Sequence, residues 1–344
     1  MSVVVEQFGL DEEQTLLLFS LQRSLIAADI AAEDRSAISQ KKKQWLGIWE
    51  KGVNDILENF ECPVTLIKDR NLLEEHCRIV VNKCTNLKTP LYLILLELSL
   101  FNPYYPLGDL SWKFYEKVNY SNKKVEPYLK KVSTLLGIRY NFINIYKKTF
   151  NKSVKSLSGF YKKMLIGAGA GTLLVAITAG FAAPVIGAMA APAGLFGAAA
   201  VNAGLAALGG GAVAAGGLGI AGGTAVIVGG GSIFGAMSGT AIGAVLGRSS
   251  DFALLESAKL EVVMKEIILQ AQKDTRFAQE ILGEQKKIIL NLEQQLSEFK
   301  FNTKENKEQI KNLEKSIDFL RNSLSNSQSA LNNFDNGDDD KKKE

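Results

Sequence analysis

Residues 164–247 contain no Asp, Glu, Lys, Arg or His, which makes an uninterrupted run of 84 uncharged residues. Twenty-three of the 31 glycines of the chain lie in this run, mixed with Ala, Val, Leu and Ile. A soluble domain of this length needs charged side chains on its surface, whereas a membrane-spanning helix needs roughly 20 consecutive apolar residues. Prolines and triple glycines divide the run into short segments. We therefore predict a membrane segment made of helical hairpins, with two or four crossings.

A ladder of glycines closes this segment, with one glycine at every fourth position: Gly231, Gly235, Gly239, Gly243 and Gly247. Residues four apart lie on the same face of a helix. Because glycine has no Cβ, a second helix can approach that face closely, and such packing drives helix association in lipid. The ladder predicts helix packing and a homo-oligomer. A buried Gly/Ala-rich helix of a soluble protein, or a flexible low-complexity segment, are the alternatives.

The approach to the uncharged run is purely basic, since no acidic residue occurs between Glu126 and Asp251. Lysines beside a membrane segment favour the cytoplasmic side and anionic headgroups. A solvated helix face and a nucleic-acid patch are the alternatives, but the adjacent apolar run favours the membrane surface and no nucleic-acid partner. The predicted membrane-surface residues are Lys147, Lys148, Lys152, Lys155, Lys162 and Lys163.

Residues 1–150 show helical spacing of apolar side chains and no alternation long enough for a sheet. The apolar stretch 91–101 is too short to span a bilayer and is interrupted by Glu97, so we expect it at the centre of a helical core. Residues 1–150 thus predict an all-α domain, followed by a basic segment at 151–163. The expected helices cover 11–34, 37–60, 71–85, 91–101, 110–118, 122–136 and 138–150.

Residues 251–333 are rich in Glu, Lys, Gln, Leu and Ile, and they predict a coiled coil ahead of a charged, disordered tail at 334–344. Apolar residues alternate in steps of three and four, as in a coiled-coil seam. One slip near residue 306 leaves two alternatives, a single helix of about 80 residues or a hairpin that folds back within 302–307. The predicted seam is Ile288, Leu292, Phe299, Ile310, Leu313, Ile317, Leu320 and Leu324.

A set of acidic turns resembles the TerB-like helical fold of tellurite-resistance proteins. It consists of Ala27, Ala28 and Asp29 with Glu33 and Asp34, then Gly108 and Asp109 with Glu116, ahead of a Leu-Gly-Ile element at 135–138. The resemblance implies paired helices, and in that family acidic residues near the turns are associated with metal binding. Two prolines and two tyrosines displace the second acidic turn here, so we predict no metal site.

The uncharged run is similar to the glycine-rich segments of transmembrane and coiled-coil proteins, in which an α/β-hydrolase domain follows. We expect no such domain in these residues, because no G-x-S-x-G motif is present and His76 is the single histidine. No phosphate-binding loop is present either. We therefore expect no enzyme, no catalytic residues and no cofactor. No signal peptide is expected at residues 1–10, and three cysteines without zinc spacing indicate free thiols.

These features together predict an all-α integral membrane protein, anchored and oligomerised through a glycine-zipper helical hairpin. Both termini are expected in the cytoplasm, where the helical and coiled-coil regions would bind a protein partner. The alternative is an α-helical pore-forming or membrane-disrupting toxin or effector. The layout of long helices around an apolar segment is similar to the cytolysin A family, and this resemblance implies a soluble form that inserts into a target membrane on assembly.

Overall fold

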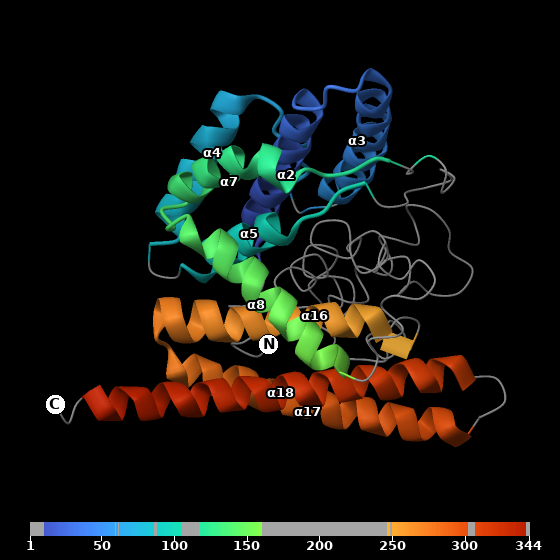
Figure 1. Ribbon diagram of the computed structural model, residues 1–344, viewed down its shortest axis with the longest axis vertical. Helices are drawn as coiled ribbons and strands as arrows, with labels where there is room; N and C mark the ends of the chain where they lie inside the picture. The colour runs from blue at the N-terminus through green and yellow to red at the C-terminus, as the bar shows by residue number, and fades with distance from the viewer. Residues whose placement is uncertain are drawn as a thin grey trace.

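All regular elements in the described part of the chain are helices, which confirms the predicted all-α class (Figure 1). The computed structural model describes residues 10–58, 60, 62–85, 88–104, 114, 117–159, 246–247, 250–301 and 307–341. Several predicted features lie outside these residues. They are nearly all of the predicted membrane segment, the ladder from Gly231 to Gly243, Lys162, Lys163 and most of the expected helix 110–118. Within them, no helix is both long and apolar enough to cross a bilayer.

The N-terminal layer is built around α2 (Glu12–Ala31), which packs against each of the other four helices of this layer. A capping box begins α2, because Asp11 Oδ1 accepts from the Gln14 N–H while Gln14 Oε1 accepts from the Asp11 N–H. Apolar side chains lie all around this helix, so it is buried on several sides at once. Its neighbours are α3 (Ser36–Leu57), α4 (Arg70–Lys83), α5 (Thr89–Leu100) and α7 (Asn122–Leu135).

Helix α5 lies in the core, as its sequence predicted. Pro90 occupies the first turn, where a missing N–H costs nothing. Ten of its twelve residues are buried, and Glu97 is among them with 0 % exposure. The apolar run 91–101 therefore serves as a core helix, and its one charge is buried with it.

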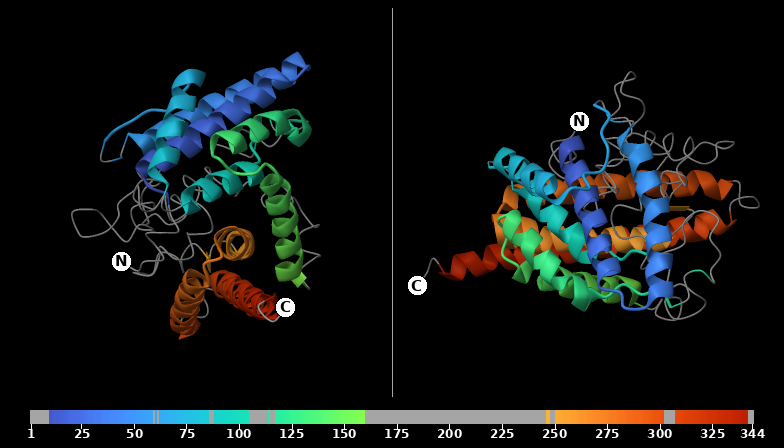
Figure 2. Two further views of the ribbon diagram at one scale, coloured as in Figure 1. Left: turned by 90° about the vertical axis from the view of Figure 1, so that its left-hand side faces the viewer. Right: turned by 90° about the horizontal axis from the view of Figure 1, so that it is seen from above.

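Helix α8 (Asn141–Ser158) connects the two layers of the molecule (Figures 1 and 2). Its buried positions follow a helical period, so one face contacts the protein along its whole length. The helix packs on α5 in the N-terminal layer and on α16 (Ser250–Val262) in the other. It runs without a break through residue 150, where the sequence had suggested a domain boundary.

The C-terminal layer consists of α16, the π-helix η5 (Val263–Gln272), α17 (Thr275–Phe301) and α18 (Lys307–Lys341). Helices α17 and α18 are antiparallel neighbours, since Lys300 pairs with Glu314 and Arg321 with Glu293. The alternative of one long helix over 251–333 is therefore wrong, because the chain reverses between Phe301 and Lys307.

A second interruption, which the sequence analysis missed, separates η5 from α17. Lys273 adopts a left-handed conformation with φ of 58°, and it ends the π-helix. Asp274 then caps α17, because its Oδ1 accepts from the Phe277 N–H at 2.8 Å. Asp274 ahead of Thr275 is the sequence signal that marks this helix start.

Candidate functional site

The two helices that flank the predicted membrane segment are antiparallel neighbours. Ser153 Oγ of α8 donates to Glu261 Oε2 at 2.8 Å, and Thr149 Oγ1, one turn earlier, donates to Glu266 Oε1 at 2.6 Å. Residue numbers thus fall along α8 as they rise along α16 and η5. The end of α8, where the chain leaves for residues 160–245, consequently lies at the same end of the molecule as the start of α16 (Figure 1).

Residues 246–247, where the described chain resumes, contact the first turns of α18. Leu246 is buried, and its carbonyl oxygen accepts from Ser316 Oγ at 3.2 Å. The Gly247 carbonyl accepts from Asn312 Nδ2 at 3.1 Å, and a Cβ on Gly247 would lie 3.6 Å from Gln309 Cβ. The last glycine of the ladder therefore packs against α18, and the end of the predicted membrane segment is fixed to the C-terminal layer.

Glu261 joins α8, α16 and α18 at one point. Its side chain is 1 % exposed. Besides Ser153, Lys265 Nζ donates to Oε2 at 2.5 Å and Asn326 Nδ2 of α18 donates to Oε1 at 2.8 Å. The several hydrogen bonds that this carboxylate accepts offset the cost of its burial. Glu261 thus fixes the position of α8 relative to α16 and α18.

A second buried charge cluster connects α16 to α5 of the N-terminal layer. Lys259 Nζ lies 3.0 Å from Glu256 Oε1 and 3.3 Å from Glu97 Oε1, and all three side chains are 0 % exposed. Burial alone would lower the pKa of Lys259, but the two carboxylates outweigh it and raise the pKa, so the ammonium stays charged. Two carboxylates around one ammonium hold the layers together.

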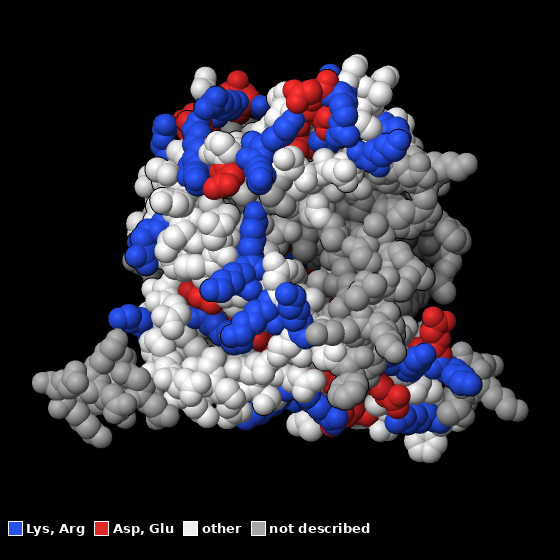
Figure 3. All heavy atoms as spheres, in the orientation of Figure 1, with Lys and Arg blue, Asp and Glu red and all other residues white. Residues whose placement is uncertain are grey.

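Three of the predicted membrane-surface lysines form a stripe on the outer face of α8 (Figure 3). Lys148, Lys152 and Lys155 are exposed and follow one another at spacings of four and three residues. Among the described residues none of the three takes part in an ion pair. Lys147 lies on a different face and is partly buried, and burial lowers its pKa against the opposing effect of Glu126.

The predicted seam of the C-terminal region packs inside the chain itself. Five of its members are buried in the layer formed by α16, α17 and α18, namely Ile288, Leu292, Leu313, Ile317 and Leu320. The other three are partly buried, namely Phe299, Ile310 and Leu324. Gln285 of α17 also contacts α18, because its Nε2 donates to the Leu320 carbonyl at 3.1 Å. These side chains stabilise the monomer.

The first acidic turn of the TerB resemblance is a closed network. Asp29 is fully buried, and its Oδ2 accepts from Lys42 Nζ at 2.5 Å and from the Tyr104 hydroxyl at 2.7 Å. Its Oδ1 accepts from the Ser121 N–H at 3.1 Å. Lys42 also lies over the Tyr104 ring and 3.2 Å from Glu33 Oε2. An ammonium group therefore supplies the positive charge beside this carboxylate.

No group of three His, Cys, Asp or Glu in the described residues is placed to hold a metal ion. The second acidic turn, with Gly108, Asp109 and Glu116, lies outside the described residues. The absence of a metal site and of an enzyme activity stays a prediction.

Known proteins give no further guide. Protein-family models, curated proteins and solved structures were compared with the chain, and none matches. The interpretation of the site therefore depends on its own geometry.

Sequence reasoning missed the residues that join the layers. Glu256, Lys259 and Glu261 lie in a charged helix and look like solvated positions in the sequence. Glu97 alone gave a signal, as the one charge in an apolar run. A buried charge of this kind requires a partner.

Proposed function

We propose that the chain is an integral membrane protein whose residues 164–245 anchor it in the bilayer as helical hairpins. The run of 84 uncharged residues supports the anchor, and the antiparallel packing of α8 against α16 and η5, the elements on either side of that segment, supports its topology. A segment whose two ends lie together at one end of a folded body enters and leaves the membrane on the same side. It therefore crosses the bilayer an even number of times.

The lysine stripe of α8 supports the same orientation. The stripe formed by Lys148, Lys152 and Lys155 ends one turn before Ser158, close to the point where the chain continues into the apolar segment. Juxtamembrane lysines contribute about 1 kcal/mol each near an anionic membrane surface. In this arrangement the stripe faces the headgroups, and both helical layers lie on the cytoplasmic side.

The glycine ladder gives the anchor its proposed second role, which is self-association. Gly239 is central in the ladder, so Gly239→Leu places a bulky side chain between the helices and is expected to weaken the oligomer. Crosslinking in mild detergent measures this, with Met237→Leu as the matched control because residue 237 is not part of the ladder. An unchanged crosslinked oligomer for Gly239→Leu removes the zipper from the proposal.

Membrane fractionation with a carbonate wash tests the anchor. Full-length protein expressed in cells is expected in the carbonate-washed pellet from the time of synthesis. Protein that stays soluble until it meets lipid vesicles contradicts a resident anchor and supports the pore-forming alternative, for which vesicle leakage is then the deciding assay. Protein that is soluble and leaves vesicles intact contradicts both.

A further inference from the structure

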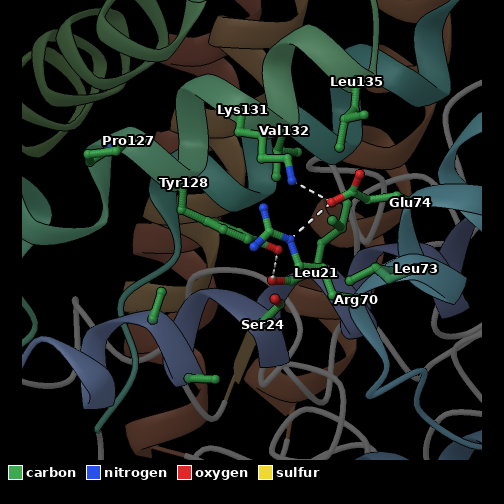
Figure 4. A pocket seen from close by; sticks show the side chains of 12 residues that line it. Leu21, Ser24, Arg70, Leu73, Glu74, Pro127, Tyr128, Lys131, Val132 and Leu135 are labelled. Atoms are coloured by element: carbon green, nitrogen blue, oxygen red, sulfur yellow. Dashed lines mark hydrogen bonds and ion pairs between the residues drawn. The ribbon is translucent and has the colours of Figure 1, made fainter.

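A cavity of about 440 Å³ lies in the N-terminal layer, between α2, α4 and α7 (Figure 4). Its walls are mainly apolar, with Leu21 and Ala28 from α2, Leu73 from α4, and Val132 and Leu135 from α7. Small-molecule pockets commonly enclose roughly 300–1,000 Å³ and are lined mostly by apolar side chains. The cavity thus has the size and lining of a ligand pocket, and it is built from elements that the membrane proposal does not use.

One side of this cavity carries an excess of positive charge. Arg70 Nε lies 3.1 Å from Glu74 Oε1, and Lys131 Nζ of α7 binds the same carboxylate oxygen (Figure 4). The Lys131 ammonium, followed by the Arg70 guanidinium, lowers the pKa of Glu74, which favours the ionised carboxylate. Two cations therefore share one anion, and the net charge at the entrance is positive.

The two hydroxyl groups of the wall are paired with protein atoms, since the Ser24 and Tyr128 side chains hydrogen-bond each other. The Tyr128 hydroxyl donates to the Leu21 carbonyl at 3.2 Å, and burial raises the pKa of Tyr128 to about 12. The phenol is neutral and its proton is already used. An alkyl chain can fill the space beside it without leaving a buried donor unsatisfied.

We propose that this cavity binds a single-chain amphiphile with a terminal carboxylate, that is, a free fatty acid. The alkyl chain occupies the apolar space between α2, α4 and α7. The carboxylate binds Arg70 and Lys131, beside or in place of Glu74. An apolar interior with a cationic entrance favours this class over alkyl alcohols, which lack the charge, and over alkylammonium ions, which the entrance repels.

Photocrosslinking tests the proposal on the full-length protein in lipid nanodiscs. A decanoate analogue with a diazirine on its chain is activated by light, and the labelled peptides are identified by mass spectrometry. Labelling is expected in α2, α4 and α7, and excess decanoate is expected to compete at least tenfold better than decanol or decyltrimethylammonium. Labelling confined to other parts of the chain overturns the proposal, as does equal competition by the three compounds.

Two variants separate the chain-binding and head-binding parts of the site. Ala28→Leu fills the partly open wall and keeps a good helix former, so labelling is expected to fall about tenfold. The double variant Arg70→Gln with Lys131→Gln is expected to remove the preference for decanoate over decanol. Lys130→Gln is the matched control, because Lys130 pairs with Glu126 and does not line the cavity.

Each variant is first checked for an unchanged thermal unfolding transition. If Ala28→Leu unfolds early, Ser24→Val narrows the same cavity one turn earlier on α2 and replaces it. Labelling that is unchanged in folded Ala28→Leu and in the double variant contradicts the site. These results are independent of the carbonate wash, so failure of the fatty-acid site leaves the anchor proposal standing.

Discussion

Two of the buried charge clusters in the described residues differ in what they connect. In the N-terminal layer, Asp29 pairs with Lys42 and also accepts hydrogen bonds from Tyr104 and from the Ser121 N–H. Between the layers, Lys259 is placed between two carboxylates, Glu97 and Glu256. The first cluster closes a network within one layer, whereas the second joins helices that lie on either side of the predicted membrane segment.

The difference shows how the chain can be one body in spite of 84 uncharged residues in its middle. The Asp29 network pairs two anions, Asp29 and Glu33, with two cations, Lys42 and Arg35, so its charge is balanced locally. Among the ion pairs of the described residues, the Lys259 cluster has one cation for two anions, so it depends on both layers to remain in place. Removal of a single partner from a buried ion pair leaves an uncompensated charge and typically costs about 3–5 kcal/mol. The clusters should therefore respond differently to loss of charge.

Lys259→Met should produce the largest effect, because it leaves Glu97 and Glu256 buried without their cation. The expected loss in free energy of unfolding is about 3–5 kcal/mol, measured by chemical denaturation in mild detergent. Lys287→Met is the matched control, since Lys287 pairs with Glu284 at the same spacing but is 66 % exposed. The control is expected to lose less than about 1 kcal/mol. Equal losses for the two variants would show that the cluster does not stabilise the fold.

Asp29→Asn should have a smaller and more local effect. Lys42 keeps Glu33 at 3.2 Å, so part of its charge remains compensated. We expect a loss of about 2–3 kcal/mol, with faster hydrogen exchange in α2 and α3 and unchanged exchange in α16. Asp318→Asn, at a position that is 54 % exposed, is the control. Faster exchange in α16 would mean that the Asp29 network also supports the contact between the layers.

Ser153→Ala removes one of the donors to Glu261 and leaves Lys265 and Asn326 in place. The expected loss is about 1–2 kcal/mol, because the carboxylate is buried and charged. A double-mutant cycle with Asn326→Ala measures whether α8 and α18 are coupled through Glu261. A coupling energy indistinguishable from zero would contradict the three-helix junction.

The smallest expected effect is that of Glu33→Gln on acid stability, at the edge of the Asp29 network. A hydrogen bond from Arg35 lowers the pKa of Glu33 from 4.5 to about 2, partial burial opposes the shift, and Lys42 adds to it. Because the folded-state pKa is the lower one, this stability is present above pH 4.5 and is lost as the pH falls towards 2. The difference in unfolding free energy between the wild type and Glu33→Gln should therefore shrink over this range. A difference that does not change with pH would contradict the assignment.

Sequence patterns predicted the helices well where local signals set them. The capping box at Asp11 and the proline at position 90 fix the starts of α2 and α5, and the apolar run with Glu97 predicted a core helix. The break at Lys273 was missed because residues 251–333 contain no proline and only one glycine, at position 283, and only the capping residue Asp274 marks it.

The charge clusters were beyond sequence reasoning for a physical reason. Glu256, Lys259 and Glu261 are buried because α8, α5 and α18 cover α16 from several sides, and such contacts leave no periodic pattern in the helix itself. The predicted seam shows the opposite situation, because its periodic pattern is clear in the sequence but does not say what the seam contacts. Its spacing predicted a surface for a partner, but α16, α17 and α18 of the same chain take up that surface.

The most direct test of the membrane proposal is to determine whether α8 and the C-terminal layer lie on the same side of the membrane. Lys155→Cys on α8 and Arg276→Cys on α17 are both exposed, and each is introduced into a Cys62→Ser background because Cys77 and Cys84 are buried. A membrane-impermeant maleimide is then applied to sealed vesicles of uniform orientation. Both cysteines are expected to be labelled together or protected together. Labelling of one position and protection of the other would place the two flanks on opposite sides and contradict the proposal.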